Sequence, residues 1–355
     1  MILPSNILTF HTKKIKAMRT QLFGLVIIAL FMTSCEEALI GPAVTNDPVS
    51  NFEEMWKSYD QYYGLFAVKG VNWQATYDEY RPLINEQTTD DALKEIFHDM
   101  IDPLDDNHTF IITTENEPRI ESGIFDTLKV QTDFSLDLIP SYVPDFTHYG
   151  TAIDYGTLEG NIGYLHLGDF IPSVNYFEDA LTYVIDKLKD TDGLIIDIRD
   201  NPGGNDVAAQ YVAGRFAEER KLYMTVRKKS GPGPNDFNQA IPWHVEPTGG
   251  TRYTEPIVLL TSRWTQSAGE TFTLAMQELS NVTQVGDYTS GAFSDNIARE
   301  LPNGWFCFMS IGDYRASDGK SYEGIGVKPD LLMVNTKADI QAGKDLTLEK
   351  ALELL

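Results

Sequence analysis

From Asn161 onward, continuous apolar runs alternate with segments whose apolar residues recur every three to four positions. The runs are typical of strands buried on both faces of a sheet, and the periodic segments are typical of helices packed against it. The expected strands are Asn161 to Leu167, Gly193 to Ile198 and Pro256 to Thr261, and the expected helices are Val174 to Lys189, Asp206 to Ala217 and Gly269 to Leu279. This alternation predicts an α/β core with parallel strand pairing.

The N-terminal part carries a helical pattern instead. Ser50 followed by Glu53 fits a capping box, and a second helix is expected from Asp90 to Ile101. We therefore expect a small helical N-terminal domain over residues 50–107 and a short β-rich connector over 108–158. A core over 159–340 and a C-terminal helix within 341–355 would follow.

Residues 1–34 have the pattern of a secretory signal. Four basic residues precede the apolar run Leu22 to Met32, which is too short to span a bilayer. Small residues then lead to Cys35, an arrangement that resembles a bacterial lipoprotein box. The resemblance implies lipidation of Cys35, a tether over 35–49, and a lipid-anchored protein at the bacterial cell envelope that faces the periplasm or the exterior. An N-terminal anchor with an incidental cysteine is the alternative, and either Met1 or Met18 could start the chain.

The chain is strongly acidic. Its formal charge is −24, and removal of residues 1–34 would take four of the 28 basic residues and none of the 52 acidic ones, which leaves −28. Such a surface repels phosphate backbones, so we expect no nucleic-acid partner. Cys307 is the only other cysteine and lies in an apolar run, so we expect it in the core and without an intrachain disulfide.

The most informative motif is the polar turn from Thr261 to Glu270, which joins an expected strand to an expected helix at Ser267. A serine at such a turn lies at the carboxyl edge of the sheet, where free backbone N–H groups converge. A hydroxyl in this setting can become a nucleophile. The turn therefore suggests hydrolysis through an acyl-enzyme.

Three further loops carry candidate chemistry. Gly203 and Gly204 follow a buried strand and can bring bare N–H groups to a ligand, although a simple tight turn explains them equally well. His108 follows the second helix, and Glu323 lies in a glycine-rich loop where a solvated acid would be ordinary. His98 is expected on a solvated helix face, and His148, His166 and His244 show no partner spacing. With no metal-ligand spacing in the chain, we expect neither a metal site nor another cofactor.

Together these motifs resemble the S41 family of serine peptidases, which includes the carboxyl-terminal processing proteases and tricorn-like enzymes. The N-P-G-G loop at 201–204, the S-A-G-E turn at 267–270 and the E-G-x-G-V-x-P-D segment at 323–330 occur in the family's order. The resemblance covers most of residues 50–335. It implies a ClpP/crotonase-like βα superhelical core in which Ser267 is the nucleophile, and residues 108–158 are too few for the PDZ domain common in the processing branch.

The resemblance also separates two ways of activating the serine. Processing proteases use a lysine after a T-x-G sequence, but Ala292 follows Thr289-Ser290-Gly291 here. The tricorn-like branch uses a histidine and a glutamate, and His108 and Glu323 match those positions by local motif. Asn107 stands where tricorn has a serine that helps to position the glutamate, a departure that leaves the His–Glu link open.

The resulting hypothesis is a serine peptidase that acts on peptides or unfolded proteins. His108 is the general base, Glu323 the orienting acid, and the N–H groups of Gly203 or Gly204 and Ala268 form the oxyanion hole. Two alternatives stay open: a noncatalytic protein that binds apolar ligands or peptides on the same fold, and an esterase.

Overall fold

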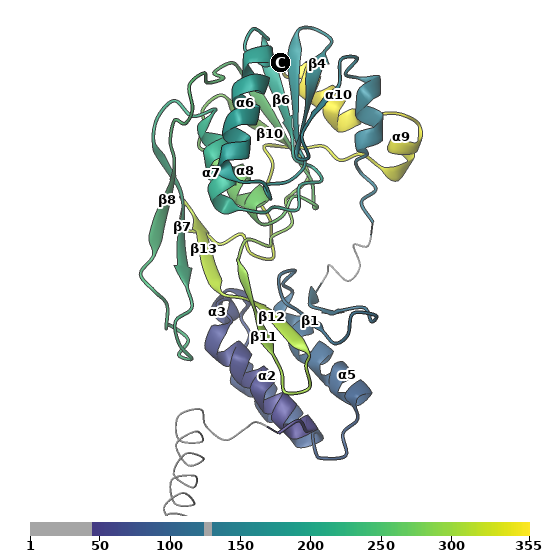
Figure 1. The fold of residues 1–355 in the computed structure, drawn as a ribbon, viewed down its shortest axis with the longest axis vertical. Coiled ribbons are helices and arrows are strands. Elements are labelled where there is room, and N and C mark those ends of the chain that lie inside the picture. The colour runs from purple at the N-terminus through teal and green to yellow at the C-terminus, as the bar shows by residue number, and fades with distance from the viewer. Residues whose placement is uncertain (1–44, 124–129) are drawn as a thin grey trace, which may run out of the picture.

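The computed structural model describes residues 45–123 and 130–355. The predicted signal peptide and the Cys35 lipidation site lie outside these residues, as does most of the predicted tether. Within the described ranges, no helix combines the length and apolar character needed to cross a membrane. Figure 1 shows two lobes, one built around a large sheet and one around the N-terminal helices.

Within the described residues the strands form three sheets, and the largest lies in the upper lobe of Figure 1. Its order is β14 (Leu331–Leu332), β10 (Val282–Gly286), β9 (Ile257–Thr261), β6 (Gly193–Asp197), β5 (Ile162–Leu167), β4 (Ile153–Leu158) and β3 (Thr147–Tyr149). The strands from β14 to β5 pair in parallel, whereas β3, β4 and β5 pair antiparallel. The predicted α/β core with parallel pairing is confirmed.

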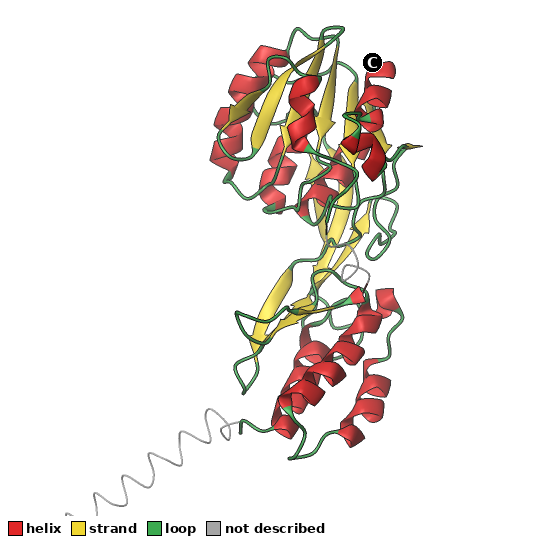
Figure 2. Ribbon diagram, turned by 90° about the vertical axis from the view of Figure 1, so that its right-hand side faces the viewer, coloured by secondary structure: helices red, strands yellow, loops and turns green. Residues whose placement is uncertain are grey.

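Helices cover both faces of this sheet (Figure 2). The helices on one face are α6 (Val174–Leu188), α7 (Asp206–Gly214) and α8 (Ala268–Gln277); those that follow the last strand are α9 (Lys337–Gln341) and α10 (Leu346–Glu353). Leu194 and Ile196 of β6 pack in one core with α6, α7 and α8, and Ile195 between them packs in a second core with α10. Alternate residues of a fully buried strand thus supply two cores.

The second lobe joins the N-terminal helices to a late hairpin. The helices are α2 (Pro48–Tyr62), α3 (Phe66–Lys69), α4 (Trp73–Tyr80) and α5 (Asp90–Ile101), and the sheet order is β11 (Asn296–Glu300), β12 (Phe306–Ser310), β1 (Phe110–Ile112) and β2 (Ile120–Glu121). Phe52, Phe97, Trp305 and Cys307 share one buried core, so Cys307 is a core residue as predicted. The third sheet, β13 (Gly312–Ala316), β7 (Lys221–Lys228) and β8 (Ile241–Val245), runs along one side of the molecule (Figure 1).

Several local predictions differ from the structure. Helix α5 has the predicted bounds, but α2 begins earlier, because Asp47 rather than Ser50 is its N-cap and accepts the Ser50 N–H. Helix α7 ends at Gly214, before the predicted Ala217, and the buried Arg215 then donates to the Thr251 carbonyl. The 108–158 segment is divided between two sheets, since β1 and β2 join the late hairpin while β3 and β4 extend the large sheet.

Candidate active site

Ser267 lies on a strained turn between β9 and α8. Its backbone has φ 52° and ψ −120°, a conformation that residues other than glycine rarely adopt. Its N–H donates to the Ala292 carbonyl at 3.0 Å, and its side chain makes no capping hydrogen bond to the helix that it precedes. The hydroxyl is therefore not used to hold the turn together.

The glycine loop packs directly against this turn. Gly203 has φ 99°, and a Cβ there would lie 2.6 Å from the Ser267 Cβ, so only glycine allows the approach. The Gly203 N–H donates to Asn201 Oδ1 at 2.8 Å and is not free for a ligand. Among the described residues, the N–H groups of Gly204 and Ala268 have no acceptor. Of the three predicted oxyanion donors, these two are the available ones.

Ser267 and His108 line the same cavity, whose volume is about 600 Å³. The His108 N–H donates to Asp106 Oδ1 at 2.9 Å, which holds the loop between α5 and β1. Burial lowers the pKa of His108 and outweighs the opposing effect of Asp106, so the ring is neutral at pH 7. No hydrogen bond joins the Ser267 hydroxyl to the ring among the described residues, and the ring Nδ1 is buried without a partner. Such bonds often tighten only when substrate binds.

Asn107 connects the histidine loop to the serine turn. Its Nδ2 donates to Gln266 Oε1 at 2.8 Å, and Gln266 in turn donates its N–H to the Asn201 carbonyl at 3.0 Å. The histidine loop, the serine turn and the glycine loop are therefore joined by hydrogen bonds. The Asn107 side chain contacts the serine turn, not Glu323.

Glu323 is buried rather than a solvated loop acid. Its exposed fraction is 4%, and Oε2 accepts the Phe293 N–H at 3.1 Å while Oε1 has no partner. Burial, helped by the nearby Asp106 charge, raises the pKa of Glu323 well above its ordinary value. Glu323 does not hydrogen-bond to His108. It holds the segment whose next residue, Ser294, lines the cavity beside His108.

The position expected for a dyad lysine holds the buried Ala292, which has no proton-accepting group. A different lysine, Lys228 at the end of β7, lines the cavity with Ser267, and sequence reasoning missed it. Lys228 forms an ion pair with Asp295. Its ammonium is thus already matched by a carboxylate, and nothing in the strand pattern of β7 marked it as a cavity residue.

Glu270, the acid of the S-A-G-E turn, is fully buried and was also missed. It accepts the Thr289 hydroxyl at 2.6 Å and the N–H groups of Gly291 and Ala292 at 2.7 Å each. Burial raises the pKa of Glu270 to about 7 despite these bonds. The Ala292 carbonyl accepts the Ser267 N–H, so Glu270 stabilises the turn that carries Ser267 through its bond to Ala292.

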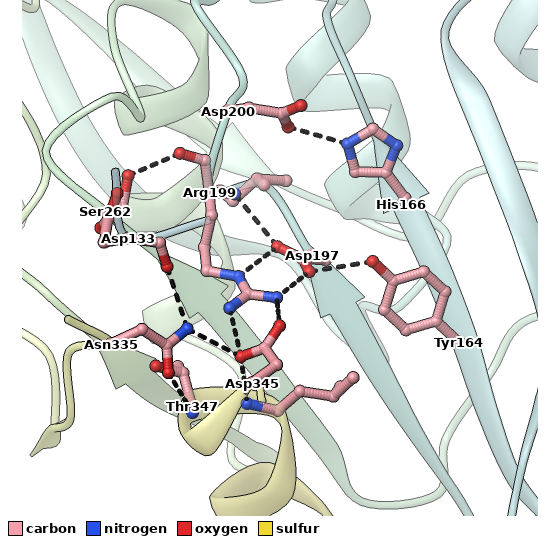
Figure 3. A network of polar contacts seen from close by, with 12 residues as sticks. Asp133, Tyr164, His166, Asp197, Arg199, Asp200, Ser262, Asn335, Asp345 and Thr347 are labelled. Carbon is pink, nitrogen blue, oxygen red and sulfur yellow. Dashed lines mark hydrogen bonds and ion pairs between the residues drawn. The ribbon is translucent and has the colours of Figure 1, made fainter. Parts of the chain in front are cut away.

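A buried polar network supports the start of the glycine loop (Figure 3). Arg199 lies between Asp197 and Asp345, and its carbonyl accepts the Ser262 hydroxyl. His166 was not expected to have partners, but it lies between Asp154 and Asp200 at 2.8 Å from each. Their hydrogen bonds outweigh the opposing effect of burial and raise the pKa of His166 to about 10. In the described ranges, no group of His, Cys, Asp and Glu is arranged to hold a metal ion.

The other histidines that the structure describes do not line this cavity. His98 is exposed on α5, as predicted, and His244 Nδ1 lies 2.9 Å from an Arg220 nitrogen. His148 contacts Asp154 at 2.5 Å on the far edge of the large sheet. Of the histidines that the structure describes, His108 is the one that lines the cavity with Ser267.

Two family models match the chain. The model of peptidase family S41 matches residues 161–333, and that of the tricorn protease C1 domain matches residues 45–102. The first contains the glycine loop, Ser267 and Glu323, and the second covers helices α2 to α5. The first match also contains β11 and β12, which lie in the lobe of the N-terminal helices.

Relatives with known names and structures are also peptidases. A crystal structure of a candidate peptidase from Parabacteroides merdae has 31% identity and a TM-score of 0.77, and the match covers 87% of this chain and 97% of that one. Carboxy-terminal processing protease CtpA of Bacillus subtilis is 29% identical over 49% of this chain, and a carboxyl-terminal-processing protease of Synechocystis is 26% identical over 55%. The matched regions span 35% and 44% of those two proteins. The chain belongs to peptidase family S41.

Proposed function

We propose that this protein is a serine peptidase that hydrolyses peptide bonds of peptides or unfolded proteins through an acyl-enzyme. The observation that carries the proposal is the shared cavity, in which Ser267 on its strained turn and the neutral His108 face the same space. Membership of the S41 family supports the same chemistry. Ser267 is the nucleophile, His108 the general base, and Glu323 the orienting acid.

In this mechanism His108 takes the proton of the Ser267 hydroxyl as its oxygen attacks the carbonyl carbon of the substrate. The oxyanion accepts the N–H groups of Gly204 and Ala268, each worth about 3–4 kcal/mol in comparable sites. His108 then protonates the leaving amine, and the acyl-enzyme remains. A water molecule, deprotonated by His108, attacks the ester and releases the acid.

The imidazolium formed in each step needs nearby negative charge. The carboxylates of Asp106 and Asp295 both favour the charged form of His108. Glu323 acts indirectly, because it holds Phe293 and thereby the Ser294 backbone beside the ring. We therefore propose a positioning role for Glu323 and charge stabilisation by the two aspartates.

We also infer that the protein works at the bacterial cell envelope, attached through a lipid on Cys35. The support is the signal-like composition of residues 1–34 and the cysteine that follows it. Expression of the full chain in bacteria with radiolabelled palmitate should label the wild type and leave Cys35→Ala unlabelled. Equal labelling of both would contradict the anchor.

The test of activity compares variants on an unfolded protein such as reduced casein. Ser267→Ala should abolish hydrolysis, and His108→Ala should lower kcat/KM by about 10²–10⁴-fold. Lys228→Gln is the control for a serine–lysine dyad and should retain most activity. Activity that survives Ser267→Ala contradicts the nucleophile, and activity lost in Lys228→Gln but kept in His108→Ala would replace the histidine by the lysine.

A further inference from the structure

The cavity beside Ser267 combines an apolar wall with unequal charges. The third sheet supplies the apolar part, with Val226 on β7, and Ile241 and Trp243 on β8. Two carboxylates, Asp206 and Asp295, and one amine, Lys228, line the same space. With His108 neutral, these side chains leave one negative charge in excess.

The negative charge of Asp295 is already balanced by a neighbouring cation. It forms an ion pair with Lys228, and the Tyr314 hydroxyl donates to its other oxygen. Burial alone would raise the pKa of Asp295, but these partners outweigh it and hold the pKa below its ordinary value. Asp295 and Lys228 therefore neutralise each other within the cavity wall.

Asp206 is different. At the first turn of α7, its Oδ1 accepts the Thr271 hydroxyl at 2.8 Å, and no Lys or Arg of the described residues lies within ion-pair distance of it. Burial, together with the charge of Asp295, outweighs the opposing effects of the Thr271 hydroxyl and of Lys228 and raises the pKa of Asp206 to about 6. At neutral pH this carboxylate is mostly ionised and partly desolvated, and its attraction to the more distant Lys228 does not offset its burial, which is an unfavourable state that a cationic ligand would relieve.

The cavity also adjoins the proposed reacting groups. The His108 ring lines it together with Asp206 and the proposed nucleophile. A side chain that enters here therefore belongs to a substrate residue that adjoins the bond under attack. The apolar wall and the uncompensated carboxylate then determine which side chain fits.

We propose that this cavity selects a Lys or Arg side chain next to the scissile bond, with Asp206 as the specificity-determining carboxylate. This inference rests on the proposed peptidase function. Lys and Arg carry an apolar stem and a charged end, so the stem can pack against Trp243 and Ile241 while the cation reaches Asp206. A Glu or Asp side chain in the same position would be repelled by the Asp206 carboxylate.

The test uses quenched fluorescent peptides of one sequence with a single variable position X, in which X is Lys, Arg, Leu or Glu. Mass spectrometry locates the cleaved bond. The wild type should cleave beside Lys and Arg with a kcat/KM at least tenfold above that for Leu, and should barely cleave beside Glu. Asp206→Asn preserves the acceptor for Thr271 and should lower the ratio of the Lys rate to the Leu rate from at least tenfold to about one.

The matched control is Asp179→Asn, which removes one carboxylate from an exposed site on α6 and should keep the Lys preference. If Asp206→Asn loses activity on all peptides, Asp206→Glu decides the point, because it restores the charge and should restore the Lys preference. Equal cleavage of Lys, Leu and Glu peptides by the wild type overturns the specificity and leaves the peptidase function intact. Failure to cleave any peptide overturns both.

Discussion

Replacement of Arg199 by Met should expose how far the fold behind the glycine loop depends on one buried cation. The Arg199 side chain is 2% exposed and lies between two carboxylates that are 0% and 1% exposed. It donates to Asp197 at 2.9 and 2.6 Å and to Asp345 at 2.8 Å twice. Methionine has a similar length but no charge, so the variant leaves two neighbouring buried carboxylates with no counter-ion.

Removal of one partner from a buried ion pair costs about 3–5 kcal/mol. The lower half of that range fits here, because each carboxylate keeps other donors: Asp197 keeps the Tyr164 hydroxyl, and Asp345 keeps the Asn335 amide. Proton uptake by one carboxylate relieves the repulsion, and a shift of one pKa unit corresponds to about 1.4 kcal/mol. The loss should therefore be smaller by about 1 kcal/mol or more at pH 5.5 than at pH 7.5.

Urea unfolding followed by tryptophan fluorescence measures this loss at both pH values. In the wild type, burial alone would raise the pKa of Asp345, but the charge of Arg199 outweighs burial and lowers this pKa below 3.8. The stabilisation by this ion pair is therefore present above pH 3.8 and is lost only as the pH falls through the lower pKa of the folded state. The wild-type network is thus intact in both buffers. Arg252→Met, at an exposed position without an ion pair to any described residue, should change the free energy of unfolding by about 0.5 kcal/mol or less. A loss below about 1 kcal/mol for Arg199→Met, or one independent of pH, would show that Asp197 and Asp345 do not need Arg199 as their counter-ion.

Three further predictions concern His108, His166 and Gly203. Because burial lowers the pKa of His108 from 6.5, the acidic limb of the kcat/KM profile should lie below pH 6.5, and a limb above 7 would contradict a buried neutral base. The pKa of His166 is raised to about 10, so the stabilisation by its protonated ring is complete below pH 6.5 and is lost as the pH rises through 10. Thermal unfolding should therefore show a larger loss of stability from His166→Phe at pH 7 than at pH 10, and equal losses at the two pH values would contradict a protonated ring. Gly203→Ala should lower peptide hydrolysis at least about 100-fold through its clash with Ser267, whereas Gly160→Ala, with φ 82° but open space around it, should leave the rate unchanged.

The sequence predicted the elements that repeat a simple pattern. Helix α5 and the βα alternation after Asn161 follow directly from the apolar pattern, since a buried strand is a continuous apolar run and an amphipathic helix repeats its apolar residues every three to four positions. The start of α2 was missed although a local signal existed. Asp47 followed by Pro48 is a good N-cap and first-turn pair, and it competes with the weaker Ser50 signal.

The side-chain partners of the site could not be predicted in the same way. His166 meets Asp154 because β4 and β5 pair in one register, and no spacing along the chain encodes that register. Lys228 reaches the cavity from strand β7, and Asp206 reaches it from helix α7. The resemblance associated Ser267 with His108, and in the structure both line one cavity. Glu323 was expected to hold His108 directly or through another group, and its carboxylate accepts the Phe293 N–H, a contact that depends on how that loop folds.

The central claim is that Ser267 is a nucleophile activated by His108. Treatment of the purified protein with a fluorophosphonate, followed by peptide mapping, tests it most directly, because only an activated serine reacts quickly. We predict one labelled residue, Ser267, with labelling at least about 100-fold slower in His108→Ala and largely retained in Lys228→Gln. No labelling of Ser267, or equal labelling in the His108 variant, would contradict the account.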